Sequence, residues 1–199
     1  DFSHILGFSL DYKAFTHHFI LKLRDQISFS RIGIFLDSDG KPSFTGKPPS
    51  NALKCIASFG LPADLVDCFQ LSRDMGIGRT VMEDSRILSA CSRAEREALS
   101  PNVQKELAIL GCQIAIPISD REGTIGVAIL SGPVTGRNYN EEELQLLYLL
   151  MEELGLAIRN SRLHAEVAAN GKLIEHVLRS MSSGALVFGE DMQVLYSNA

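Results

Sequence analysis

The chain has 199 residues, 45% of them hydrophobic and 22% charged, which is enough apolar material for a core of domain size. Its net charge of −5 argues against a nucleic-acid partner, because a basic face supplies most of the affinity for nucleic acid. The longest apolar stretch, Leu144 to Met151, is far shorter than the ~20 residues of a membrane span. We therefore expect no membrane contact by this segment.

The four cysteines are Cys55, Cys68, Cys91 and Cys112, and none forms a Cys-x-x-Cys pair. We interpret them as unpaired thiols in a reducing compartment, which predicts a cytoplasmic protein. The first residues contain neither an initiator methionine nor the basic region of a signal peptide. We therefore expect that both ends were cut from a longer chain.

The first elements in chain order are a helix and two strands. Tyr12, Phe15, Phe19, Leu23 and Ile27 recur at helical spacing, which predicts an amphipathic helix over Asp11–Ile27. Alternating β-branched and aromatic residues predict strands over Phe29–Asp37 and Ala52–Phe59, separated by a polar loop rich in Gly and Pro. These two strands are expected to form a hairpin.

The middle of the chain is predicted to hold short helices around one strand. We expect helices over Ala63–Gln70 and Ile77–Glu83, and a short strand over Arg86–Ala90. A further helix is expected over Ala94–Leu110, with Pro101 breaking or restarting it.

Two apolar runs, Gln113–Ser119 and Thr124–Ser131, flank the turn Asp120-Arg-Glu-Gly123 and predict a hairpin. Pro117 inside the first run would ordinarily demote that run to an edge strand or a bulge. Six apolar residues of the hairpin are expected to be largely buried: Ile114, Ile116, Ile118, Ile125, Val127 and Ile129.

A long helix is predicted from Asn140, its N-cap, to about Asn170, with Glu143 completing a capping box. One apolar stripe consists of Leu144, Leu147, Met151, Leu154 and Ile158. A second consists of Leu146, Leu149, Leu150, Leu156 and Ala157, interrupted by Glu153. A helix that is apolar nearly all round must be buried on more than one face. One stripe covers the sheet, and the other predicts self-association.

The Asn170-Gly171 pair is a possible end for this helix, because Gly is the usual left-handed cap. The apolar pattern nevertheless resumes beyond it, with a change of phase near Ala168–Lys172. Two short strands, Ala185–Phe188 and Met192–Tyr196, are then expected to form another hairpin.

This order of elements resembles the GAF domain, most specifically over Gln113 to Leu163, where GAF domains of sensor kinases commonly carry a proline at the place of Pro117. The resemblance implies an α+β fold, an antiparallel sheet with helices on both faces. The helices Asp11–Ile27 and Asn140–Asn170 would share one face, and the middle segment would cover the other. The tail, with Ser183-Gly-Ala-Leu-Val-Phe-Gly and Val194-Leu-Tyr-Ser-Asn-Ala, looks like the opening of a PAS domain.

The resemblance divides the chain into an N-terminal lead-in (1–10), a GAF-like domain (11–166), a connecting helix (167–182) and the first PAS-like strands (183–199). It implies a cytoplasmic, non-catalytic sensory or dimerisation module of a two-component sensor histidine kinase. A PAS domain and a kinase or other output domain are expected downstream. The expected assembly is a parallel homodimer whose interface is formed by Leu146, Leu149, Leu150, Leu156 and Ala157.

An alternative within the same fold is a cysteine-dependent methionine-sulfoxide reductase, for which Cys91 and Cys112 are the candidate residues. No cofactor is evident, and no metal site is expected: Gly76-Ile-Gly78 lacks the third glycine of a dinucleotide fingerprint. A small-molecule ligand, unidentified from the sequence, would lie between the sheet and Met75–Leu110. Arg79, Arg86 and Gln113 are the candidates for its polar contacts.

Overall fold

The computed structural model describes residues 12–37, 51–180, 186–188 and 193–197 of the chain. Its strands are β1 (Ile32–Asp37), β2 (Ala52–Phe59), β3 (Gln70–Ser72), β4 (Leu88–Ser89), β5 (Ile114–Ser119), β6 (Thr124–Leu130), β7 (Leu186–Phe188) and β8 (Val194–Ser197). Its helices are α2 (Tyr12–Gln26), α3 (Ala63–Cys68), α4 (Gly76–Asp84), α5 (Arg93–Ala98), α6 (Pro101–Leu110) and α7 (Glu141–Ser180). The first six strands form one antiparallel sheet in the order β3-β2-β1-β6-β5-β4, which confirms the expected fold class.

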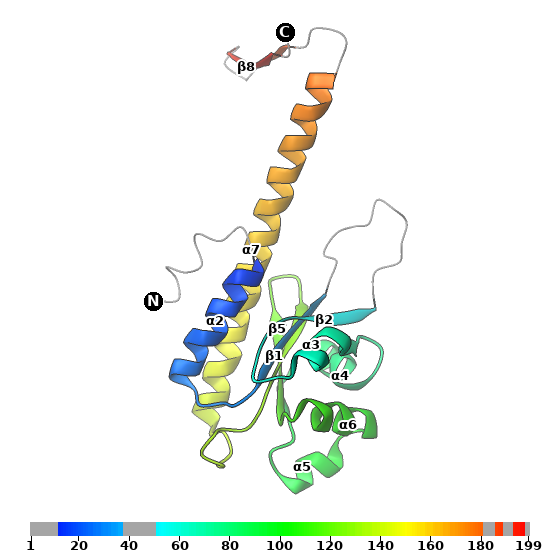
Figure 1. Ribbon diagram of the computed structural model, residues 1–199, viewed down its shortest axis with the longest axis vertical. Coiled ribbons are helices and arrows are strands. Elements are labelled where there is room, and N and C mark those ends of the chain that lie inside the picture. The colour runs from blue at the N-terminus through cyan, green and yellow to red at the C-terminus, as the bar shows by residue number, and fades with distance from the viewer. Residues whose placement is uncertain (1–11, 38–50, 181–185, 189–192, 198–199) are drawn as a thin grey trace.

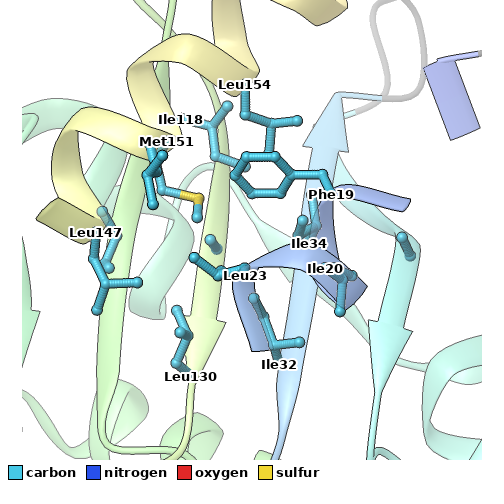
Figure 2. Packing of buried hydrophobic residues seen from close by; sticks show 14 of the residues in the cluster. Phe19, Ile20, Leu23, Ile32, Ile34, Ile118, Leu130, Leu147, Met151 and Leu154 are labelled. Carbon is cyan, nitrogen blue, oxygen red and sulfur yellow. The ribbon is translucent and has the colours of Figure 1, made fainter. Parts of the chain in front are cut away.

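Helices α2 and α7 lie together on one face of the sheet (Figure 1). Figure 2 shows Phe19 and Leu23 of α2 and Met151 and Leu154 of α7 around Ile34 of β1. All five residues belong to one buried apolar cluster. The two helices predicted for this face are therefore confirmed, and burial of their apolar stripes is the main force that holds them there.

Helices α3 to α6 belong to the opposite face, where a second apolar cluster forms (Figure 1). Its fully buried members include Phe35, Leu53, Leu71, Ile77 and Val81. Because the sheet is covered on both faces, its central strands have continuous apolar sequences rather than the alternation of a half-exposed strand.

The β5–β6 hairpin was predicted correctly, and five of its six selected apolar residues are buried. The exception is Ile125, which is only half-buried and packs at the margin of the first cluster. Pro117 pairs with Val127 and lies beyond the two β4–β5 pairs, at a part of β5 that β4 does not cover. A proline is tolerated there because its missing N–H removes no bond to β4.

The boundaries of β1 and α3 differ from those expected from the sequence. Strand β1 begins at Ile32 instead of Phe29, because the backbone N–H groups of Ser30 and Arg31 donate to Ser131 Oγ, at 3.0 and 3.1 Å, instead of to a neighbouring strand. Helix α3 ends at Cys68, and the residues that follow pair with β2 as the three-residue strand β3. Edge strands this short carry little sequence signal.

The predicted break at Pro101 is confirmed. Helix α5 begins with a capping box in which Ser92 Oγ accepts from Glu95 N and the Glu95 carboxylate accepts from Ser92 N. Helix α6 then starts with Pro101 at its first position, where a proline N–H would have no helical partner in any case.

Helix α7 has the predicted capping box: Asn140 Oδ1 accepts from Glu143 N at 2.7 Å, and Glu143 accepts from Asn140 N at 3.0 Å. The helix then runs without interruption through Asn170 and Gly171 to Ser180, so the possible end at that pair was wrong. The expected boundary between residues 166 and 167 therefore falls inside one continuous helix. Glycine costs a helix only ~1 kcal/mol, which α7 tolerates.

The predicted tail hairpin is present as β7 and β8, an antiparallel pair. The lead-in, residues 1–10, lies outside the described residues. Within the described part of the chain, no helix is both long and apolar enough to cross a bilayer.

Candidate functional site

Five large apolar side chains of α7 are exposed among those that the structure describes, and they form a line along the helix that we name the α7 stripe. Its members are Leu146, Leu149, Leu156, Leu163 and Val167. Their exposed fractions run from 40% at Leu156 to 70% at Val167. The line spans about 32 Å at the rise of an α-helix. Exposed apolar surface of this extent is typical of interaction surfaces.

The spacing of the α7 stripe is that of a coiled coil. Written as the heptad abcdefg, Leu146 and Val167 are a residues, and Leu149, Leu156 and Leu163 are d residues. Every large exposed apolar residue of the helix up to position 170 whose side chain is described fits this frame. A repeat of 3.5 residues keeps an apolar seam facing one partner only if both helices supercoil, so the pattern favours another helix as the partner.

Two residues of the expected interface lie elsewhere. Leu150 is only 6% exposed and belongs to the cluster between α7 and the sheet. Ala157 is half-buried and packs against the same cluster. The sheet-facing row, Leu147, Met151, Leu154 and Ile158, is fully buried as predicted. Leu150 must therefore be removed from the interface, because a 3.6-residue period rotates position 150 towards the core.

Helix α7 is fastened to the β5–β6 hairpin. A Cβ added at Gly155 would lie 2.0 Å from the carbonyl oxygen of Ser119, so the glycine allows the helix to approach β5 closely. One turn later, Arg159 donates to Glu122, and its Nη1 lies 3.5 Å from Asp120 Oδ2. The side chain of Asp120 is only 1% exposed. These contacts hold the helix at the turn of the hairpin.

The same helix is also tied to the end of β1. Arg162 Nη2 donates to the carbonyl oxygen of Asp37 at 2.9 Å. The carboxylate of Asp37 in turn accepts from Arg73 Nη1 at 2.7 Å, and Arg73 lies between β3 and α4. These two contacts link the segment that leads into α4 to α7, through the end of a central strand.

The second apolar cluster lies on the expected ligand face, and the three candidate polar residues have separate surroundings. Arg79 is exposed and pairs with Glu83 one turn away on α4. Arg86 is exposed, and Gln113 is half-buried beside Gly132. The role of Arg79, Arg86 and Gln113 as polar contacts of a ligand therefore stays a prediction.

A carboxylate that the sequence did not reveal does lie in this region. Glu106 Oε2 of α6 accepts from Ile77 N at 2.6 Å, at the first turn of α4. Met75, at the N-cap position of α4, provides no side-chain cap. Burial raises the pKa of Glu106, and the bond from Ile77 opposes part of that effect. Glu106 thus supplies a negative group to the positive end of the α4 dipole.

Both glycines of Gly76-Ile-Gly78 have packing reasons. Gly76 has φ +64°, and a Cβ there would lie 2.3 Å from the Glu106 carboxylate oxygens. A Cβ at Gly78 would lie 2.2 Å from the carbonyl oxygen of Ser72. The motif serves the packing of α4 against β3 and α6, so it gives no support to a dinucleotide site.

The cysteines of the reductase alternative lie in different clusters. Cys112 is buried in the cluster beneath α3 to α6, where burial raises its thiol pKa to about 12. Cys91 packs at the margin of the cluster beneath α2 and α7. A raised pKa keeps a thiol protonated and therefore a poor nucleophile. Among the described residues, no three metal-ligating side chains gather in one place.

Comparisons with known proteins agree on the fold. A family model described as "GAF domain" matches residues 13–159. A GAF domain/HD domain protein from Geobacter sulfurreducens is 15% identical, with a TM-score of 0.61, over 82% of this chain and 99% of that one. Residues 122 to 287 of a methyl-accepting chemotaxis protein are 15% identical, with a TM-score of 0.64, over 82% and 98% of the two chains.

A third solved structure is the GAF domain of a phosphoenolpyruvate-protein phosphotransferase from Coxiella burnetii. It is 16% identical, with a TM-score of 0.62, over 83% of this chain and 92% of that one. No curated protein matches the chain. At these identities the solved structures demonstrate a shared fold.

Proposed function

The chain belongs to the GAF domain family, and from this premise we propose that it is a sensory and dimerisation module of a cytoplasmic signalling protein. Two copies associate in parallel through the α7 stripe. The module has no catalytic activity of its own. Its role is to pass a conformational signal along α7 to the segment that follows.

The observation that supports this proposal best is that α7 has two apolar surfaces, one buried against the sheet and one exposed. One row of the helix is fully buried against the sheet, while the α7 stripe is exposed along the same turns. The helix also continues from Glu141 to Ser180 without a break. A rearrangement of the sheet therefore acts directly on a rigid element that leaves the domain. Regulation requires that a ligand or partner favours one arrangement energetically.

We further propose that the parent protein is a sensor histidine kinase. In this proposal β7 and β8 begin a PAS domain, and the kinase lies downstream. The proposal is supported by the order of elements and by relatives whose names place the fold in chemotaxis and phosphotransfer proteins. A small molecule bound between the sheet and helices α3 to α6 would be the input.

Replacing Leu149 by Glu tests the dimer. Leu149 is 50% exposed, so the substitution leaves the core intact but places a charge in the seam. A buried unpaired charge is energetically unfavourable, and we expect the dissociation constant of the dimer to rise by at least about two orders of magnitude. Sedimentation equilibrium measures the change.

The matched control is Ala165→Glu, an exposed position of the same helix on the side away from the seam, which adds the same charge and should leave the dimer unchanged. Circular dichroism should show the same helix content in both variants. If the parent chain sediments as a monomer at micromolar concentrations, the proposed dimer is wrong.

A further inference from the structure

The heptad frame of the α7 stripe places two polar residues at its seam. The a positions between Leu146 and Val167 are occupied by Glu153 and Asn160, and both side chains are exposed. All three d positions of the stripe, from Leu149 to Leu163, are leucines. The two seam positions differ in chemistry, because a carboxylate only accepts hydrogen bonds, whereas a side-chain amide both donates and accepts.

We propose that Asn160 is the residue that fixes the orientation and register of the paired α7 helices. This inference rests on the proposed dimer. In a parallel, in-register pair, Asn160 faces the partner's Asn160, and the two amides can exchange hydrogen bonds. A single asparagine at an a position is known to select register and strand number at the expense of stability.

The antiparallel arrangement leaves the amide without a polar match. Antiparallel helices place a residues against d residues, so Asn160 would face a leucine of the d series, the partner's Leu149 or Leu156 according to register. A buried amide without a hydrogen-bonding partner is unfavourable. A parallel pair shifted by one heptad would set one Asn160 against Glu153 but the other against Val167, so one of the two amides would lose its polar partner.

Glu153 acts differently from Asn160. In the parallel, in-register pair, the two copies of Glu153 face each other, and like charges in close contact repel. Glu153 therefore weakens the parallel, in-register pair, an effect that the hydrogen bonds between the two Asn160 amides must outweigh. The favourable polar pair is the one formed by Asn160.

The position of Asn160 along the chain suits this role. It follows Ile158, the last residue of the buried row, and lies beside Arg159, which binds the turn of the β5–β6 hairpin. Asn160 would therefore fix the register at the point where α7 leaves the sheet. Because the helix is continuous, the remainder of α7, to Ser180, would have the same register.

Cysteine cross-linking tests the inference directly. Leu146 is the first a residue of the α7 stripe and Leu163 is its last d residue. Both are exposed, so each can be replaced by Cys without disturbing the core. The exposed native Cys68 is replaced by Ser in the same background. A mixture of the two variants, one of them carrying a size tag, is then oxidised.

With Asn160 present, we expect cross-links between identical positions only, 146 with 146 and 163 with 163. Asn160→Leu should tighten the dimer by roughly tenfold, because it completes the apolar seam. It should also allow cross-links between 146 and 163, an a residue and a d residue that face each other only in an antiparallel pair. The control Asn102→Leu, an exposed asparagine of α6, should change neither result.

The possible outcomes separate the two proposals. A monomer at all concentrations overturns the proposed dimer itself. A dimer that stays parallel and in register after Asn160→Leu leaves the dimer standing and overturns the role of Asn160. Cross-links between 146 and 163 in the presence of Asn160 overturn it as well.

Discussion

At the scale of single residues, the least expected finding is the capping of α4 by a distant carboxylate. Glu106 reaches the first turn of α4 from a position 29 residues away. Sequence patterns identify caps that are local, such as Asn140 with Glu143 or Ser92 with Glu95. A cap supplied by tertiary packing leaves no such pattern.

Removal of this cap should destabilise the protein. Glu106→Ala deletes the acceptor for Ile77 N, and we expect a loss of about 1 kcal/mol in the free energy of unfolding. Glu106→Gln keeps an acceptor oxygen and is the control, with a smaller loss or none. Urea denaturation of the three proteins measures the difference, and equal losses in both variants would contradict a capping role.

The pH dependence has a definite sign. Burial raises the pKa of Glu106 in the folded protein above its value in the unfolded chain. The contribution of this group to stability is therefore largest below the unfolded pKa, and it declines as the pH rises through the folded pKa. Glu106→Gln should remove this decline, so its stability relative to the parent protein should improve from about pH 4 to pH 7.

At the scale of elements, the contact between α7 and β5 depends on a missing side chain. Gly155 lies in the middle of a helix, where glycine is unfavourable by ~1 kcal/mol relative to alanine. The close approach of Ser119 explains why a glycine stands there. The contact also defines how near the helix lies to the hairpin turn.

Gly155→Ala should therefore destabilise the protein although it improves helix propensity. The new methyl group would meet the Ser119 carbonyl oxygen and push α7 away from β5, at a cost of about 1–3 kcal/mol. Thermal unfolding measures the effect. The exposed Ala165 on the same helix provides the reference for propensity, since Ala165→Gly should cost only about 1 kcal/mol. Stabilisation by Gly155→Ala would refute the close contact.

The long elements could be predicted from the sequence, because their apolar periods are long and their caps are local. The short ones could not: β3 has three residues and β4 has two, and pairing with β2 and β5 decides their form. Of the candidate interface residues, Leu146, Leu149 and Leu156 are exposed as expected, whereas Leu150 is buried. The sequence shows that α7 is apolar on two sides. Which residues at the border of those sides are buried depends on how α7 packs against the sheet.

At the scale of the whole molecule, the sheet separates two apolar clusters that pack against different helices. The cluster beneath α2 and α7 holds the helix that leaves the domain. The cluster beneath α3 to α6 lies on the face where a ligand is proposed. The contacts from Arg73 to Asp37 and from Arg162 to Asp37 join the two sides.

A ligand of the α3–α6 face should raise the unfolding temperature of the whole domain. A compound that binds only the folded protein adds about 2.7 kcal/mol at one hundred times its dissociation constant. A thermal-shift screen of small metabolites detects such a compound. Met82→Trp, at the margin of that cluster, should abolish the shift, while Leu146→Ser on α7 should preserve it. If no compound shifts the transition, the proposed ligand input is wrong.

Because α7 is uninterrupted, its length in residues determines the direction in which its C-terminal end faces. Each residue of an α-helix turns the chain by about 100° and advances it by about 1.5 Å. The direction in which the end of α7 faces is therefore determined by the number of residues between the last sheet contact and Ser180. In the proposed dimer, lengthening or shortening this helix by seven residues would turn its end by only about 20° and keep it on nearly the same side of the dimer axis. A change of two residues would turn it by about 200°, to the opposite side.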